Sequence, residues 1–137
     1  MRRSLALTLC LLPLAGCGSD QDPPAAARAP DRGAQVYAMH CATCHQRDGR
    51  GLAGAQPSVA GSPTVLGPAD ELIRWVMFGE RPPTLAAYRG VVVMPAFAWL
   101  SDEDLAGVLT HVRQSFGNDA PPVDPASVAA IRAVGKP

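Results

Sequence analysis

The chain has 137 residues, of which 12 are basic and 12 acidic, and this length suits one small domain with tails. Because the formal charge is zero at neutral pH, the composition gives no reason to expect nucleic acid as a partner. Aromatic residues make up only 5% of the chain, so a domain of this size has a thin apolar core of its own.

Residues 1–16 predict an export signal. Arg2 and Arg3 precede an apolar run, Leu5 to Leu14, which is too short to span a bilayer but suits a signal peptide. The run ends in LAGC, which resembles the lipobox of bacterial lipoproteins and implies cleavage before Cys17 and lipidation of its sulfur. The alternative is a plain secretory signal with a chance Cys. We expect a protein that is lipid-anchored to a bacterial membrane and faces the periplasm.

Residues 17–30 comprise this Cys and a polar segment rich in Pro and Ala, which predicts a disordered tether. Its root-mean-square reach is roughly 20 Å, so a folded domain would stay close above the membrane.

Three helices are expected in the domain that follows. The first begins near Asp31, a favourable N-cap, and runs into the region of Cys41. Gln46 to Pro68 is too rich in Gly and Pro for a long element and predicts a wrapped loop. A second helix is expected over Ala69–Phe78, with Gly79 beyond its end.

The third helix has the clearest signals. Ser101 can cap it, Asp104 stands three residues later in a variant of the capping box, and Gly117 can end it. Its apolar stripe consists of Leu105, Val108, Leu109, Val112 and Phe116. Since no segment has the alternation of a convincing strand, the predicted class is all-α.

Residues 41–45 (CATCH) form the attachment sequence of c-type haem. Two thiols three positions apart on a helical turn can reach both vinyl groups of the porphyrin, and the next residue then lies under the iron. We predict one covalent haem c, bound through Cys41 and Cys44, with His45 on the iron. Zinc would need four N or S ligands, and a thioredoxin-like pair would need a βαβ context. The sequence offers neither.

Met94 is the best candidate for the second axial ligand. Pro95 biases its backbone toward extended geometry, which suits a thioether pointing inward from a loop. Met77 is expected in the core of the second helix, and Met39 is too near the attachment turn to fold back. His111 flanks the apolar stripe and is expected in packing or at the surface.

Residues 31–118 resemble class I bacterial c-type cytochromes, which implies three main helices around one haem. Gly33 and Tyr37 match the small and aromatic residues with which the family's first helix crosses its last one. The family usually has an aromatic residue where this chain has His111, which implies a more polar crossing. Pro57 matches the Pro whose carbonyl accepts the Nδ1–H of the haem His, a bond that fixes the ring.

The run from Met94 to Asn118 is similar to cytochrome subunits that accept electrons from periplasmic dehydrogenases. Residues 119–137 are a Pro-rich tail in which Asp124 to Val134 resembles a short C-terminal helix of some such subunits. The resemblance implies a one-electron carrier rather than an enzyme. Its partners would be a dehydrogenase or respiratory complex as donor and a terminal oxidase as acceptor, with no nucleic acid.

Two other hypotheses remain. A peroxidase-like or gas-sensing haem would have an open iron and a distal acid or base, for which His40 and His111 are the remaining histidines. A subunit docked on a dehydrogenase would share the carrier's chemistry and differ in its partner. Asp102, Glu103 and Asp104 could form an acidic docking patch, although a negatively charged helix N-terminus is the favoured interpretation.

Trp75 is expected in the core, while Trp99 could fill the core or contact the haem. Arg81 or Arg89 could pair with a haem propionate.

Overall fold

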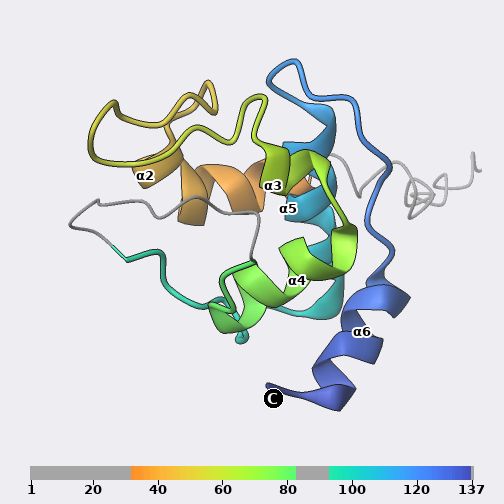
Figure 1. Cartoon of the computed structure of the whole chain (residues 1–137). Helices are drawn as coiled ribbons and strands as arrows, with labels where there is room; N and C mark the ends of the chain where they lie inside the picture. Colours follow the sequence, from red (N-terminus) through yellow and green to blue (C-terminus); the bar gives the residue numbers. More distant parts are fainter. Residues whose placement is uncertain (1–31, 83–92, 137) are drawn as a thin grey trace, which may run out of the picture.

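The computed structural model describes residues 32–82 and 93–136 (Figure 1). The predicted signal, Cys17, the tether and the Asp31 cap therefore lie outside the described residues, as does Arg89. Within the described ranges the regular structure is helical, apart from one isolated bridge between Leu52 and Gln56. This confirms the all-α prediction.

The first helical segment changes its winding as it approaches the cysteines. Residues 32–36 are α-helical, η1 (Tyr37–Cys41) is a π-helix, and α2 (Ala42–His45) is a final α-helical turn. The Ala42 N–H donates to the Tyr37 carbonyl five residues earlier. Single π-helical turns occur frequently at functional sites. The sequence predicted a helix here but not this turn.

The stretch Gln46–Pro68 has no long element, as predicted, but it contains one short helix that was not predicted, α3 (Pro63–Leu66). A short helix can start there because Pro at its first position lacks only an N–H that would have no helical partner. α4 (Ala69–Phe78) has the predicted bounds, and Gly79 ends it in the left-handed region with a φ of 73°.

α5 (Asp102–Gln114) begins as predicted, with the Asp104 N–H donating to the Ser101 hydroxyl at 3.1 Å. The prediction that Phe116 continues the helical stripe was wrong, because the helix ends at Gln114 and Phe116 has a φ of 60°. This backbone turns the Phe116 ring back onto Tyr37, with the ring centroids 5.1 Å apart.

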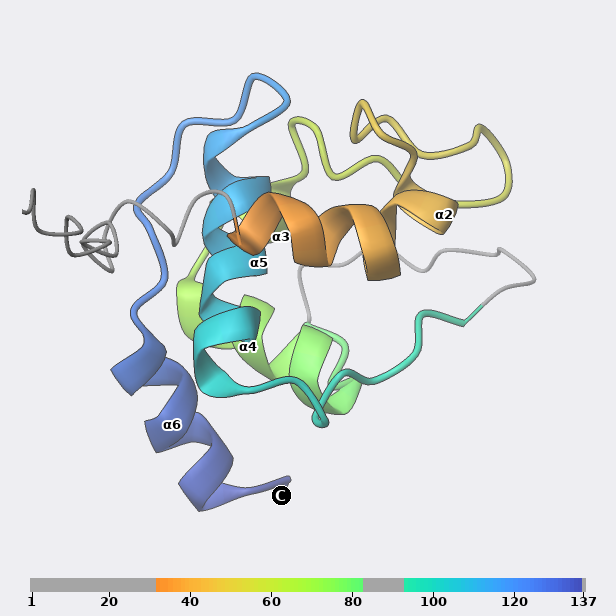
Figure 2. The ribbon, with the colours of Figure 1, turned by 180° about the vertical axis from the view of Figure 1, so that it is seen from behind.

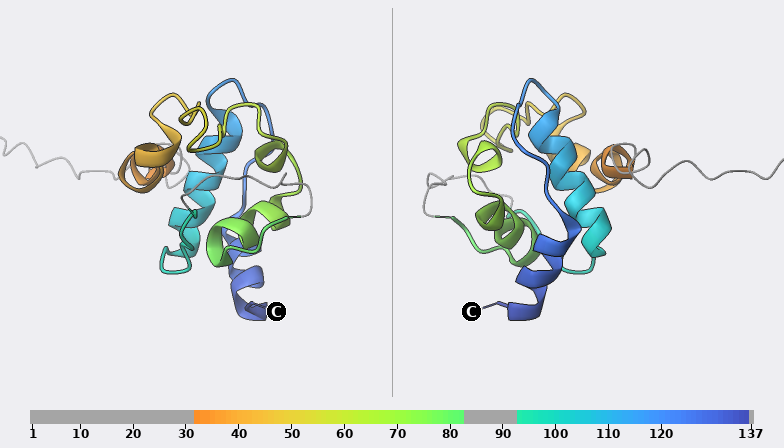
Figure 3. Two further views of the ribbon diagram at one scale, coloured as in Figure 1. Left: turned by 60° about the vertical axis from the view of Figure 1, so that its left-hand side comes forward. Right: turned by 90° about the vertical axis from the view of Figure 1, so that its right-hand side faces the viewer.

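α6 (Pro125–Val134) confirms the predicted C-terminal helix. Asp124 caps it by accepting from the Ala126 N–H at 2.9 Å. Val128 and Ile131 are buried. α6 packs against α5 and α4, and Figure 3 shows it beside the lower end of α5.

α5 is the central element, in contact with η1, α3, α4 and α6. The N-terminal helical segment crosses it (Figure 2). At the crossing a Cβ on Gly33 would lie 2.1 Å from the Gly107 carbonyl oxygen, so the two backbones touch. The predicted close crossing is thus confirmed. Among residues 32–82 and 93–136, the largest fully buried side chains are Ile73, Met77, Leu105 and Val128. Met77 therefore lies in the core, as predicted.

Candidate functional site

Cys41 and Cys44 lie on adjoining turns at the end of the first helical segment, and both are half-buried free thiols. Burial raises the pKa of Cys41 to about 11, with the neighbouring Cys44 as a second cause. A thiol with such a pKa is protonated at neutral pH. The described residues contain no cluster of three or more His, Cys, Asp or Glu that could hold a metal ion. The zinc and thioredoxin-like alternatives thus gain no support.

His45 ends α2, and its half-buried imidazole faces the following loop. Its Nδ1 lies 2.9 Å from the carbonyl oxygen of Pro57. A carbonyl only accepts, so the bond requires the proton on Nδ1. The other nitrogen, Nε2, then carries a free lone pair that can bind a metal. Within the described residues, the hydrogen bond of the His45 ring is the one made by Nδ1.

Gly51 allows the loop to bring Pro57 to His45. Its N–H donates to the His45 carbonyl at 2.9 Å, and its φ is 67°. A Cβ at this position would lie 2.4 Å from the Gln56 carbonyl oxygen and 2.6 Å from that of Pro57. Gly51 was missed as a site residue, although the Gly-rich loop was the signal that could have found it.

Tyr37 fixes the backbone directly after His45. The family resemblance had indicated only that Tyr37 takes part in the helix crossing. Its hydroxyl donates to the Gln46 carbonyl at 2.7 Å. Gln46 has a φ of 61°, which is costly for a residue with a side chain. Burial raises the pKa of Tyr37 to about 12, followed by the effects of Cys41 and Asp48. The hydroxyl therefore remains a donor at physiological pH.

Met94 lies in the irregular segment before α5, as the sequence predicted, and its half-buried side chain packs against the apolar core. The Phe97 N–H donates to the Val76 carbonyl at 2.9 Å and so fixes this segment to the last turns of α4. The segment and α2 lie on the same side of α5 in Figures 1 and 2.

The other two histidines have surroundings of a different kind. His40 is exposed, and its ring packs against that of Trp99 in a T-shaped arrangement, with the ring centroids 5.0 Å apart. Trp99 is itself 63% exposed and does not fill the core. His111 packs against Tyr37 and Phe116, at 5.4 Å from each ring, and burial lowers its pKa. His111 is thus the packing residue that the sequence predicted, and the helix crossing retains a cluster of rings.

The carboxylates at the start of α5 are mostly paired. Asp104 binds Arg32, and this hydrogen bond is the main reason that its pKa is lowered. Asp102 binds Arg132 at 2.8 Å. Because arginines neutralise two of the three acidic groups, these residues do not form a free acidic docking patch. They are better interpreted as the negatively charged N-terminus of α5.

Trp75 lies on α4, and Arg81 lies just beyond its end. Trp75 is only partly buried at the edge of the core, less than the sequence predicted. The Arg81 guanidinium lies 6.0 Å from the centre of the Trp75 ring.

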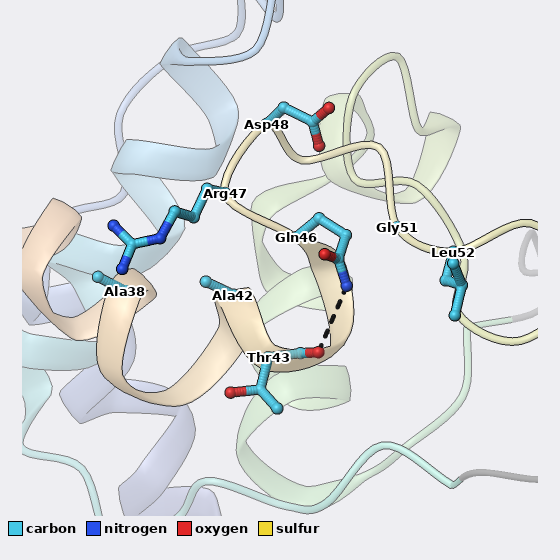
Figure 4. Close-up of a pocket in the computed structure, with 8 residues that line it drawn as sticks. All are labelled: Ala38, Ala42, Thr43, Gln46, Arg47, Asp48, Gly51 and Leu52. Atoms are coloured by element: carbon cyan, nitrogen blue, oxygen red, sulfur yellow. Dashed lines mark hydrogen bonds between the residues drawn. The ribbon is translucent and has the colours of Figure 1, made fainter.

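An open depression of about 720 Å³ lies beside the attachment turn (Figure 4). Ala42, Thr43, Gln46 and Leu52 are among its lining residues, whereas neither cysteine, nor His45, nor Met94 contributes to it.

The donor set itself fits haem c. It combines two free thiols on neighbouring turns with an adjacent imidazole whose Nδ1 is already engaged. A thioether in a half-buried loop can supply a second axial ligand.

Comparison with known proteins gives a consistent result. The family described as cytochrome c oxidase, cbb3-type, subunit III matches residues 28–112. The cytochrome c subunit of the quinone alcohol dehydrogenase of Gluconobacter oxydans is 36% identical over 108 residues, which are 77% of this chain and 23% of that subunit. The gluconate 2-dehydrogenase cytochrome c subunit of Pantoea cypripedii is 38% identical over 64% of this chain and 21% of its own length.

Cytochrome c-552 of Thermus thermophilus is 37% identical over 93 residues, which cover 63% of this chain and 69% of the relative. By contrast, the chain spans less than a quarter of the length of the two dehydrogenase subunits. Among the described residues, no helix combines the length and the apolar character needed to span a membrane.

Proposed function

The chain belongs to the cytochrome c family, and from this premise we infer that it is a one-electron carrier working through covalently bound haem c. When bound, the haem supplies an iron that changes its charge by one. We propose that Cys41 and Cys44 form the two thioether bonds and that His45 is the first axial ligand. The observation that carries this proposal is the CATCH turn with its His45 imidazole anchored to the Pro57 carbonyl.

The anchoring bond has two expected effects on His45. It fixes the orientation of the ring, so that Nε2 is aimed in one direction, and it makes the imidazole more basic. Gly51 and Tyr37 support this bond, one by leaving room for the loop and the other by holding the Gln46 carbonyl. The protein therefore contributes an imidazole ligand whose orientation is already fixed by the fold.

We propose Met94 as the second axial ligand. Its half-buried position in the loop before α5 supports this role, as does Pro95 immediately after it. With both axial positions filled, no site is open for a substrate, and thioether ligation raises the reduction potential. The exposed His40 and the packed His111 give no support to a peroxidase-like alternative.

The setting of the carrier is also a proposal. We place the haem domain at residues 31–118, tethered by residues 17–30 to a lipid on Cys17 at the periplasmic side of a bacterial membrane. The dehydrogenase subunits among the relatives support a dehydrogenase as electron donor. A respiratory complex is the alternative donor, and the electrons would pass on toward a terminal oxidase. A stand-alone carrier and a docked subunit would differ in whether the chain co-purifies with a dehydrogenase.

The experiment is to produce the chain in a host that attaches haem c and to extract it with acid acetone. We expect the haem to stay with the polypeptide and the intact mass to rise by one haem. Replacing both Cys41 and Cys44 by Ser should make the haem extractable. An unmodified wild-type mass together with extractable haem would contradict the proposal.

A further inference from the structure

Arg132 in the last turn of α6 reaches across to the segment that joins the methionine loop to α5. Its Nη1 donates to the Ala98 carbonyl at 2.5 Å and its Nη2 to the Leu100 carbonyl at 2.8 Å. Its Nε donates to the Asp102 carboxylate at 2.8 Å. One planar guanidinium thus binds three acceptors within five consecutive residues, a geometry that a Lys ammonium cannot reproduce.

The segment bound by Arg132 is also held by contacts with α4 and the core. Phe97 is buried and donates its N–H to the Val76 carbonyl of α4 at 2.9 Å. Leu100 is buried as well, and its N–H donates to the Phe97 carbonyl at 3.1 Å. Met94 stands only three residues before Phe97, so the fixed part of the chain begins almost at the methionine.

α6 is well packed against the rest of the fold, so it can hold Arg132 in a fixed position. Val128 is fully buried and Ile131 nearly so, and the Asp124 cap fixes the start of the helix. The match to the cytochrome family covers residues 28–112 and therefore ends before α6 begins. The contact thus comes from a part of the chain beyond the matched haem domain.

We propose that Arg132 is a positioning residue, which clamps residues 98–102 and thereby keeps Met94 in place as an iron ligand. The proposal rests on the assignment of Met94 under the proposed function. Without the guanidinium, the Ala98 and Leu100 carbonyls lose their fixed partner, and the loop can move away from the core more often. An external ligand would then replace the thioether more readily.

The test compares two full-length haem-loaded variants, Arg132→Leu and Arg32→Leu. Both remove one Arg and one ion pair with the first turn of α5, but the hydrogen bonds of the Arg32 guanidinium go to Asp104 and not to residues 98–102. For Arg132→Leu we expect cyanide to bind the ferric protein about tenfold faster, because the variant loses the charge-assisted hydrogen bonds that hold this segment. Arg32→Leu should bind cyanide at the wild-type rate. Equal rates in all three proteins, or equal acceleration in both variants, would overturn the clamp.

Amide hydrogen exchange provides a second readout that does not depend on the iron. Exchange at Phe97 and Leu100 should accelerate in Arg132→Leu and stay unchanged in Arg32→Leu, while Arg132→Lys should fall between Leu and wild type. If wild-type protein binds cyanide at once and lacks a sulfur-to-iron absorption band, the Met94 assignment fails by itself. Amide hydrogen exchange alone then tests whether Arg132 holds residues 98–102. Unchanged exchange at Phe97 and Leu100 in Arg132→Leu would refute that contact's role.

Discussion

The Nδ1 atom of His45 lies 2.9 Å from the Pro57 carbonyl oxygen, although twelve positions separate the two residues in the sequence. The loop between them must fold back over the attachment turn for this bond to form. Gly51 lies at the tightest point, where its N–H binds the His45 carbonyl and its Cα faces the Gln56 and Pro57 carbonyls. A side chain at this position should therefore disturb the imidazole indirectly.

Gly51→Ala should destabilise the fold and change the reduction potential. The new Cβ would lie 2.4 Å from the Gln56 carbonyl oxygen, so the loop must move and the bond from His45 to Pro57 must lengthen. We expect a loss of about 2–4 kcal/mol, from overpacking together with the strain of a positive φ. A weaker bond makes the imidazole less basic, which disfavours ferric iron and raises the potential. Thermal unfolding and redox titration measure the two effects.

Gly54→Ala is the matched control for this prediction. Gly54 is in the same loop and has a φ of 78°, but a Cβ there would meet no atom within 4 Å. It should lose only the strain, about 1–2 kcal/mol, and keep the wild-type potential. Equal effects of the two substitutions on the potential would show that the close approach at Gly51 does not matter to His45.

The fold could be predicted from the sequence wherever local signals agree. The bounds of α4 follow from its Pro, its acidic first turn and Gly79, and α6 follows from Asp124-Pro125. Phe116 was misplaced because its contact with the Tyr37 ring overrides the helical period. The π-helical turn and α3 carry no strong local pattern, so they could not be predicted from spacing alone.

In the candidate site, too, some residues could be predicted from local sequence and others could not. The attachment turn is a contiguous motif, so its residues can be read directly, and Pro57 followed from a family resemblance. The support given by Gly51 and the hydrogen bond of Tyr37 to Gln46 depend on tertiary contacts between separate segments. Arg132 is still less visible, because nothing in its neighbourhood on α6 indicates that it meets the loop before α5.

His111→Phe should remove part of the loss of stability in acid. Burial among rings lowers the pKa of His111 in the folded state, so the unfolded chain binds this proton more readily. The free energy of unfolding therefore falls as pH drops through about 6.5, the ordinary pKa of His, and levels off below the folded pKa. A Phe cannot take up the proton, and it suits the contacts with Tyr37 and Phe116. Urea unfolding of both proteins from pH 8 to pH 5 measures the slope.

The contribution of His111 is the difference in unfolding free energy between wild type and His111→Phe, compared at each pH. A His111→Phe protein that loses stability as steeply as wild type between pH 7 and pH 5 would show that His111 does not cause the slope.

Cys17→Ser should release the protein from the membrane. If LAGC directs lipidation, the sulfur of Cys17 carries the anchor, and a hydroxyl cannot form the same thioether. We expect the wild type in the membrane fraction, labelled by radioactive palmitate, and the variant unlabelled. Both should retain covalent haem, since Cys41 and Cys44 are unchanged. A wild-type protein that takes up no palmitate would end the lipoprotein hypothesis.

Met94→Ala decides between a closed and an open iron. If the thioether binds, the ferric wild type should show the weak sulfur-to-iron band at the red end of the spectrum and a potential raised by Met/His ligation. The variant should lose the band, fall in potential and bind carbon monoxide in the ferrous form. Met77→Leu is the control, because Met77 is fully buried in the core and this exchange nearly conserves volume. Its band and potential should match those of wild type. A wild-type protein that binds carbon monoxide at once and turns over peroxide would contradict the carrier, since an iron that already binds external ligands cannot have Met94 as its sixth ligand.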